Sequence, residues 1–342
     1  MRALWTTATF AILAFGAGAT PQFSPTSRAD WANQLSFDIP VRLLQMDFPF
    51  EVEYNPEIEK QLDGYLRRGR RETERMLGRA ALYFPIFEYY LKENGLPECL
   101  KYIPLLESRL RPEATSVSGA AGLWQFMPET AEHYKLQANE YFDDRMNPFR
   151  STEAAVKMLS QLYEHFGDWS LALAAYNCGP GRVRSALRRT GCDNFWDIQH
   201  LLPRQTQRYL PALIATIYVA RDYPQYGLKP RQAGYCQKPF RVFKVHSELQ
   251  LDEIARHCQL QETELLRLNP GYLQGYIPYA GKGHYLILPE GTYARFQQYI
   301  IKKSRKGALR YAVAILDSRS GLPPGPGSQA GTGASIAAKG DI

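Results

Sequence analysis

The chain has 342 residues, a formal net charge of +7 and a pI near 9.0, and 45% of its residues are apolar. This composition is ample for packed cores, and the length allows two domains of about 100 to 200 residues each. A basic chain favours anionic partners such as nucleic acid, an acidic lipid surface or a carboxylate-bearing peptide, although ordinary solubility charge explains it equally well. No cysteine lies in a C-x-x-C or C-x-x-C-H pattern, so zinc, redox and haem sites have no support.

The first 19 residues have the pattern of a secretory signal peptide. Arg2 precedes a mostly apolar stretch, Ala3 to Phe15, and the small residues Ala17-Gly18-Ala19 follow. This stretch is shorter than the ~18 residues of a membrane-spanning helix, and no later segment is long and apolar enough either. We therefore expect an exported protein of the periplasm or cell envelope, soluble or peripheral at a membrane, and export argues against nucleic acid as a partner.

The number of cysteines is odd, so at least one is free or pairs between chains. The first is Cys99, so we expect no lipid-bearing cysteine after the signal peptide. Cys178 and Cys192 flank a Gly-rich turn and are the first candidates for a disulfide, although the sequence does not establish the pairing. Because no histidine neighbours Cys178, a small packed residue is a better interpretation than a nucleophile. The five are Cys99, Cys178, Cys192, Cys236 and Cys258.

Helical periodicity begins near Glu57 and continues through most of the chain up to residue 224. Asn147-Pro148 has the pattern of a cap followed by proline in the first turn, and Gly167 follows the last residue of the next apolar stripe. Asp168 is placed to cap another helix, from Trp169 to Asn177. Few segments alternate as strands do, so the sequence predicts a mainly α chain.

A small module with a β-α-α-β order is predicted near the C-terminus. Its expected strands and helices are Phe240 to Val245, Leu251 to His257, Glu262 to Leu268 and Tyr285 to Leu288. The Gly-, Pro-, Ser- and Ala-rich tail cannot bury enough apolar surface to offset its ordering entropy, so we expect disorder there. The predicted parts are a linker at 225–239, the module at 240–290, an extension at 291–321 and the tail at 322–342.

Three short blocks have the chemistry of one saccharide-cleaving site. A carboxylate ends an apolar segment that Pro97 opens, an amide lies in an aromatic turn after a small-residue loop, and a phenol and an amide end an Ala-rich helix. Helix termini present side chains to clefts, which suits an acid catalyst. The blocks are Glu107-Ser108, Gly122-Leu123-Trp124-Gln125-Phe126-Met127-Pro128 and Tyr176-Asn177-Cys178-Gly179-Pro180-Gly181.

In that order the blocks resemble the lytic transglycosylases of bacterial cell walls, most closely the family of membrane-bound lytic murein transglycosylase D, over roughly Phe37 to Tyr223. The resemblance implies a lysozyme-like helical domain at 35–224 that acts on peptidoglycan glycan strands without a cofactor or a metal. The C-terminal module is similar to a LysM glycan-binding module. It departs at Lys244-Val245-His246-Ser247-Glu248, which lacks the usual Gly-Asp pair, so its fold is expected and its glycan affinity stays open.

The resemblance also implies a mechanism with one carboxylate. Glu107 acts first as acid and then as base, and the sugar's own 6-hydroxyl closes onto C1, so that cleavage of the MurNAc-GlcNAc bond leaves a 1,6-anhydro-muramyl end. By the same resemblance, Ser108 orients the acid or contacts the peptide-bearing sugar. Gln125 and Tyr176 border the scissile sugar, and Asn177 supports their turn.

The residues themselves support Glu107 as an acid. An unperturbed glutamate has a pKa of about 4.3, and a partly apolar wall such as Ile103 to Leu106 raises that pKa, as in the lysozyme acid. General acid catalysis of this kind contributes roughly 10²- to 10⁴-fold. The alternative is a helix-end residue in a salt bridge with Arg109 or Arg111.

A hydrolytic glycosidase adds a second carboxylate, ~5 to 5.5 Å away as a nucleophile or ~6.5 to 9.5 Å away as a base. For each candidate a helix cap or a surface charge is the better interpretation, and a metal site at the paired aspartates lacks further oxygen ligands. The candidates are Glu113, Glu129, Asp143 and Asp144.

Two alternatives to a lytic transglycosylase stay open: a hydrolytic muramidase of the lysozyme type and a non-catalytic peptidoglycan-binding protein. One departure bears on efficiency, because Gln205 occupies the place of the glutamate in the family's Leu-Pro-x-Glu-Thr-x-x-Tyr pattern. Gly119 and Gly122 are expected to let the backbone approach the glycan closely. The sequence does not determine the oligomeric state or whether cutting is endo or exo.

Overall fold

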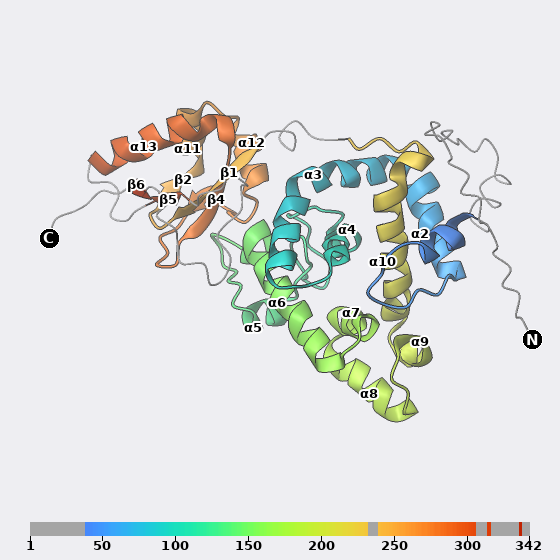
Figure 1. The fold of residues 1–342 in the computed structure, drawn as a ribbon. Coiled ribbons are helices and arrows are strands. Elements are labelled where there is room, and N and C mark those ends of the chain that lie inside the picture. Colours follow the sequence, from blue (N-terminus) through green and yellow to red (C-terminus); the bar gives the residue numbers. More distant parts are fainter. Residues whose placement is uncertain (1–37, 232–238, 306–312, 316–334, 337–342) are drawn as a thin grey trace, which may run out of the picture.

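A computed structural model of the protein describes residues 38–231, 239–305, 313–315 and 335–336. The expected signal peptide at 1–19, Cys236 and most of the 322–342 tail lie outside the described residues. The described part is mainly helical, with a small sheet near the C-terminus (Figure 1), so the predicted fold class is confirmed. No helix in the described ranges has the length and apolarity needed to cross a membrane.

The N-terminal domain is a set of packed helices. The long α10 contacts α2, α4 and α7, and α6 contacts both α3 and α7. Large side chains such as Phe87, Trp124, Phe149 and Tyr218 are fully buried between them. The helices are α2 Pro56–Asp63, α3 Arg70–Glu93, α4 Ile103–Ser108, α5 Pro128–His133, α6 Pro148–Phe166, α7 Trp169–Cys178, α8 Pro180–Thr190, α9 Phe195–Ile198 and α10 Arg204–Asp222.

The predicted caps position the two central helices. The side chain of Asn147 accepts hydrogen bonds from two backbone N–H groups at the start of α6, and Gly167 ends that helix in the left-handed conformation. Asp168 then accepts from the N–H of Leu171 and so begins α7. Both caps are confirmed, and α7 runs one residue further than expected, to Cys178.

The C-terminal module has the predicted β-α-α-β order. Strand β1 pairs with β4 antiparallel over their whole length, and Figure 1 shows the helices on one side of this sheet. In the predicted 291–321 extension lies α13, which contacts α11. The elements are β1 Phe240–Val245, β2 Leu249–Gln250, α11 Leu251–Cys258, α12 Glu262–Leu268, β3 Tyr276–Ile277, β4 His284–Pro289, α13 Tyr293–Arg305, β5 Val313–Ile315 and β6 Ser335–Ile336.

Two further boundaries differ from the sequence prediction. Strand β6, which pairs with β5, lies in the tail that was expected to be disordered, because backbone hydrogen bonding to a sheet edge requires little apolar surface. The first part of the predicted linker is also folded. The backbone N–H of Arg231 donates to the carbonyl of Glu74 (2.8 Å) and its guanidinium pairs with the Glu74 carboxylate (2.9 Å), so the chain is held against α3 before it leaves the helical domain.

The candidate disulfide between Cys178 and Cys192 does not form in this structure. Both cysteines are free, as are Cys99 and Cys258. The whole of α8 lies between Cys178 and Cys192, and Gly179 and Gly191 border that helix at its two ends. The Gly-rich turn that suggested the pairing is therefore a helix start rather than a closed loop.

The module is held against the helical domain by the loop that precedes α6. The N–H of Asp143 donates to the carbonyl of Gly271 (2.8 Å), and the N–H of Leu273 donates to the carbonyl of Tyr141 (2.9 Å). Between these bonds the Phe142 ring is buried in the module's own core, in contact with His284. A segment of the helical domain thus completes the core of the module.

Replacing Phe142 with alanine is expected to lower the free energy of unfolding by about 3 kcal/mol, because it removes a buried ring and leaves a cavity at the junction. Chemical denaturation with intrinsic fluorescence measures the loss. Leu273→Ala is the matched control, since Leu273 lies on the facing loop but is 49% exposed. Equal stability of the two variants would contradict this role for Phe142.

Candidate active site

Glu107 lies in the last turn of α4, as the sequence predicted. The helix ends abruptly because Arg109 and Leu110 both adopt left-handed backbone conformations, with φ of 54° and 56°. Their N–H groups donate to the carbonyls of Leu105 and Pro104, which closes the helix end. The chain therefore turns away directly after Glu107, and the carboxyl is carried on a short, rigid element.

Within the described ranges, one hydrogen bond orients the Glu107 carboxyl. The Tyr209 hydroxyl on α10 donates to Glu107 Oε1 at 2.7 Å. Burial raises the pKa of Glu107 to about 7, although the Tyr209 hydrogen bond acts in the opposite direction by favouring the charged form. Near neutral pH a substantial fraction of Glu107 therefore carries a proton, as a general acid requires.

Neither alternative interpretation of Glu107 matches the geometry. Among the described residues, neither Arg109 nor Arg111 pairs with it; instead the Arg109 carbonyl accepts from Arg79 (2.9 Å). The pKa of Glu107 has two causes, burial and the Tyr209 hydroxyl, and no second carboxylate contributes to it. Glu107 is thus a partly buried acid with a phenol as its partner.

The other candidate carboxylates have structural partners or lie in solvent. Asp143 accepts from the N–H of Arg145 and forms an ion pair with its guanidinium (2.7 Å). Asp144 accepts from the N–H of Gln137 and lies 3.9 Å from Arg150. Glu113 and Glu129 are exposed. The surface interpretation holds for Glu113 and Glu129, whereas Asp143 and Asp144 are buried, 5% and 7% exposed, and are structural hydrogen-bond and ion-pair partners rather than a surface pair.

Tyr176 ends α7 close enough to Glu107 that the carboxylate charge helps to raise the pKa of its phenol, after burial as the larger cause. Its hydroxyl donates to the carbonyl of Trp124 at 2.7 Å. Trp124 itself is core, fully buried with its indole N–H donating to Thr152. Tyr176 therefore joins α7 to the aromatic turn that carries Gln125.

Gln125 has a left-handed backbone conformation (φ 51°) at the tip of this turn. Its side-chain Nε2 donates to the carbonyls of Gly122 (2.8 Å) and Ala114 (3.1 Å). Both amide hydrogens are committed to the loop, so the side-chain oxygen is the group available as an acceptor. Gln125 is partly exposed, whereas its neighbours Trp124 and Phe126 are buried.

Ser108 is buried and directed toward backbone carbonyls. It is 4% exposed, and its hydroxyl lies 3.0 Å from the Pro104 carbonyl and 2.9 Å from the Leu123 carbonyl. These contacts link α4 to the aromatic turn directly beside Glu107. Of its two expected roles, orienting the acid is the one that this geometry supports.

Gly122 is required by the protein rather than by a ligand. Its φ is +85°, and a Cβ at this position would lie 1.7 Å from the carbonyl oxygen of Arg145. The close backbone approach expected here is therefore an approach to another part of the chain. At Gly119, also at positive φ, an added Cβ would meet Pro128 at 3.8 Å and no other described atom within 4 Å.

The last predicted residue, Asn177, accepts a hydrogen bond from the Thr206 hydroxyl (2.8 Å), which ties the end of α7 to the start of α10. Gln205, the departure from the family pattern, directly precedes Thr206 in the chain and is exposed. Tyr209 lies on the same helix and was not predicted as a site residue. The sequence could have indicated Tyr209, because it is the tyrosine that ends the Leu-Pro-x-Glu-Thr-x-x-Tyr pattern, three residues after Thr206.

Comparison with known families fits this geometry. Residues 84–199 match the transglycosylase SLT domain, and residues 240–301 match the LysM-like domain of lytic transglycosylase MltD. The two matched regions follow one another along the chain, with residues 200–239 between them. The second match includes α13, so the module extends beyond its predicted end at residue 290.

Two curated relatives from Escherichia coli K12 are similar. Membrane-bound lytic murein transglycosylase D is 30% identical over 244 residues, which is 70% of this chain and 53% of the relative. Soluble lytic murein transglycosylase is 32% identical over 111 residues, 31% of this chain and 17% of the relative. The chain thus spans about half the length of the first relative.

Among solved structures, the crystal structure of the 70 kDa soluble lytic transglycosylase from Escherichia coli matches with a TM-score of 0.38 and 22% identity, over 59% of this chain and 33% of that one.

Stability should depend on pH through Glu107. Since folding raises its pKa from 4.5 to about 7, ionisation costs the folded state up to about 3 kcal/mol. The stability that the protonated carboxyl contributes is fully present below pH 4.5 and is lost as pH rises through 7. Glu107→Gln, which cannot ionise, should gain stability relative to the parent between pH 5 and pH 8, measured by denaturation at each pH. A stability difference that is constant across this range would contradict a raised pKa.

Tyr209→Phe should raise the pKa of Glu107 further, because it removes the hydrogen bond that favours the carboxylate. The basic limb of the pH–rate profile for clearance of purified cell walls should therefore move to higher pH, by about one pH unit. Tyr176→Phe is the matched control for this shift, since its hydroxyl donates to Trp124 rather than to Glu107. A basic limb that moves equally in both variants, or in neither, counts against the assignment.

Proposed function

We propose that this protein is a peptidoglycan lytic transglycosylase in which Glu107 alone supplies both acid and base. The observation that carries the proposal is a partly buried carboxyl with a pKa of about 7, held by Tyr209, with no second carboxylate acting on it. The SLT domain match at residues 84–199 supports the reaction class. The relatives that match over part of the chain support murein as the substrate.

In the first step protonated Glu107 donates its proton to the oxygen that links MurNAc to GlcNAc. The bond from that oxygen to C1 of MurNAc breaks, and positive charge develops on C1 and the ring oxygen. Because the carboxyl is poorly solvated, protonation at neutral pH is available without an acidic medium. The resulting carboxylate keeps its hydrogen bond from Tyr209.

In the second step the Glu107 carboxylate takes the proton of the 6-hydroxyl of MurNAc. The freed oxygen bonds to C1, which gives the 1,6-anhydro-muramyl product and returns Glu107 to its protonated form. No water is consumed and no cofactor or metal enters the balance. A pKa near the ambient pH suits this double role, because the protonated form is then available as the acid of the first step and its carboxylate as the base of the second.

The remaining residues are assigned to binding and orientation. We propose that the free oxygen of Gln125 accepts from a sugar N–H or hydroxyl, and that Tyr176 borders the scissile sugar. Ser108 fixes α4 against the aromatic turn, and Asn177 fixes α7 against α10. The expected export to the periplasm or cell envelope belongs to the same proposal, as does peptidoglycan binding by the LysM-like module.

The nearest rival, a hydrolytic muramidase, would need a base for water. Its second carboxylate would contribute to the pKa of Glu107, and the described residues provide none that does. The other rival, a non-catalytic wall-binding protein, would have no use for a carboxyl with a raised pKa. The geometry therefore favours the lyase.

Digestion of purified peptidoglycan separates these functions. The parent should release muropeptides that are one water lighter than hydrolysed ones, identified by mass spectrometry, and Glu107→Gln should lose at least about 10²-fold in rate. Glu113→Gln is the control, because Glu113 is exposed in a nearby turn and has no role in the proposal. Hydrated products would favour the muramidase, and undiminished clearance by Glu107→Gln would overturn catalysis by this residue.

A further inference from the structure

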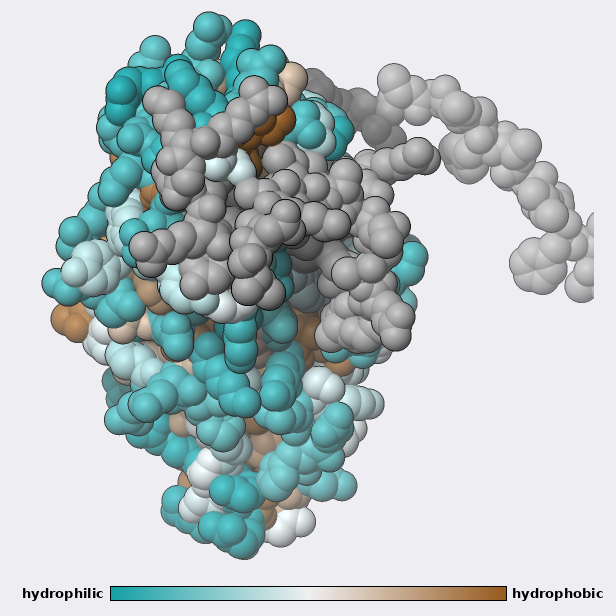
Figure 2. Space-filling view, turned by 90° about the vertical axis from the view of Figure 1, so that its left-hand side faces the viewer, coloured by the Kyte–Doolittle hydropathy of each residue, from teal (hydrophilic) through white to brown (hydrophobic). Residues whose placement is uncertain are grey.

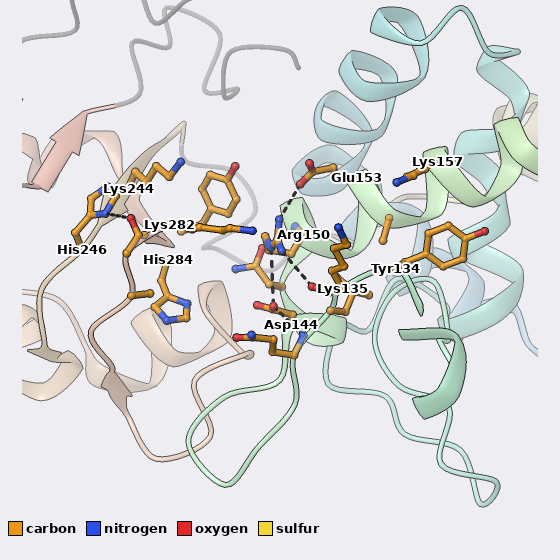
Figure 3. A pocket seen from close by; sticks show the side chains of 18 residues that line it. Tyr134, Lys135, Asp144, Arg150, Glu153, Lys157, Lys244, His246, Lys282 and His284 are labelled. Atoms are coloured by element: carbon orange, nitrogen blue, oxygen red, sulfur yellow. Dashed lines mark hydrogen bonds and ion pairs between the residues drawn. The ribbon is translucent and has the colours of Figure 1, made fainter. Parts of the chain in front are cut away.

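A cavity of about 740 Å³ lies between the helical domain and the module, apart from Glu107 and its partners. One wall is the loop before α6 and the first turns of α6 (residues 134–157), and the other is the end of β1 and the loop that leads into β4 (residues 280–285). Figure 3 shows side chains from both domains facing the space between them. Its size is typical of a ligand site rather than of a packing defect.

The lining of this cavity is strongly basic. Five of its side chains are lysine or arginine and two are carboxylates: Lys135, Arg150, Lys157, Lys244 and Lys282 against Asp144 and Glu153. Both carboxylates are already paired with Arg150, at 3.9 Å and 3.0 Å. Among the described residues, none of the four lysines forms an ion pair. The excess positive charge is therefore available to a ligand.

The position of His284 reports the same local charge. Burial is the first cause that lowers the pKa of His284 to about 4, and the charges of Arg150 and His246 lower it further. His284 is therefore neutral at pH 7 and does not add to the positive charge of the cavity. It lies against the buried Phe142 ring, so the floor of the cavity is fixed to the junction.

On the module side of the cavity, the loop at Gly283 packs closely on the Lys244 and His246 side chains. Gly283 has φ of +71°, and a Cβ there would lie 2.8 Å from both the Lys244 Cγ and the His246 ring. The His246 ring in turn lies 3.1 Å from the Gly281 carbonyl. Only glycine at 283 lets the loop pack this closely on Lys244, and the same loop carries Lys282 toward the side of the cavity where Arg150 lies (Figure 3).

We propose that this interdomain cavity binds the carboxylates of the peptide carried by the glycan strand, and so holds a peptide-bearing strand across both domains. This rests on the proposed function, which makes peptidoglycan the substrate. Lysines spread over two walls suit an extended ligand with several separate negative charges, since each ammonium acts as a point charge with rotatable donors. Outside the grey atoms, the face of the molecule shown in Figure 2 is mainly hydrophilic.

The test is calorimetric binding to the full chain carrying Glu107→Gln, which prevents turnover. The probes are a disaccharide with its tetrapeptide, the same compound with its carboxylates amidated, and the peptide-free disaccharide. We expect the acidic probe to bind more tightly than the other two. We also expect its affinity to fall as salt rises from about 0.05 to 0.5 M.

Lys244→Gln/Lys282→Gln on the module and Lys157→Gln on α6 should each weaken the acidic probe, the double variant by about five- to tenfold. Binding of the amidated probe should not change. Lys302→Gln is the matched control, because it removes the same charge from an exposed position on α13 outside the cavity. Equal melting temperatures confirm that the variants are folded, and Lys157→Gln gives an independent reading should the double variant unfold.

The inference would be overturned if the acidic and amidated probes bound alike, or if the lysine variants bound the acidic probe as the parent does. It would also be overturned if the protein failed to bind the acidic probe but bound vesicles with about one third phosphatidylglycerol through these lysines. The last would make the cavity a membrane contact. The two proposals fail separately, because binding is measured without turnover. Hydrated reaction products would contradict the proposed reaction but not a lysine-dependent peptide site. Anhydro products would support the reaction but would not support a peptide site that failed the binding test.

Discussion

Withdrawal of the Glu107 carboxyl from water is the constraint on which the rest of the site depends. One carboxyl can give a proton and then take one back only when its two forms are close in free energy at the working pH. Burial supplies that balance by raising the pKa to about 7, and the Tyr209 hydroxyl limits the rise. Helices α4, α7 and α10 meet so that both Tyr176 and Tyr209 lie near this carboxyl.

A continuous set of short contacts leads from this carboxyl to the module. Ser108 holds the Leu123 carbonyl, and Gly122 packs directly on the carbonyl of Arg145. The Arg145 guanidinium reaches back to Gly119 (2.8 Å) and pairs with Asp143, whose N–H donates to Gly271 of the module. Almost every bond in this series involves backbone, so the loop that carries Gln125 and the loop that docks the module are parts of one rigid unit.

This connection fixes how the LysM-like module lies against the helical domain. Its core is completed by Phe142 from the helical domain, so it is held in one orientation rather than on a free linker. The basic cavity forms only in that orientation, because its two walls come from residues 134–157 and 244–285. A ligand that bridges the walls would lie in a defined register relative to the helical domain.

The sequence determined the local structure and the chemistry of single residues. Asn147 and Gly167 fixed the two ends of α6 and Asp168 the start of α7, because caps act within a few residues of themselves. The Glu107 block ended a helix as expected. Apolar periodicity likewise placed β1 and α12.

Only the tertiary structure decided which groups meet. Tyr209 lies 102 residues from Glu107 in the chain, Gly122 is required by Arg145, Ser108 is turned toward backbone, and Cys178 and Cys192 stay apart. The lysines of the cavity are ordinary surface charges in the sequence and become a site only when the module docks. The physical reason is that burial, pKa and electrostatic potential depend on neighbours in space, whereas capping and periodicity depend on neighbours in the chain.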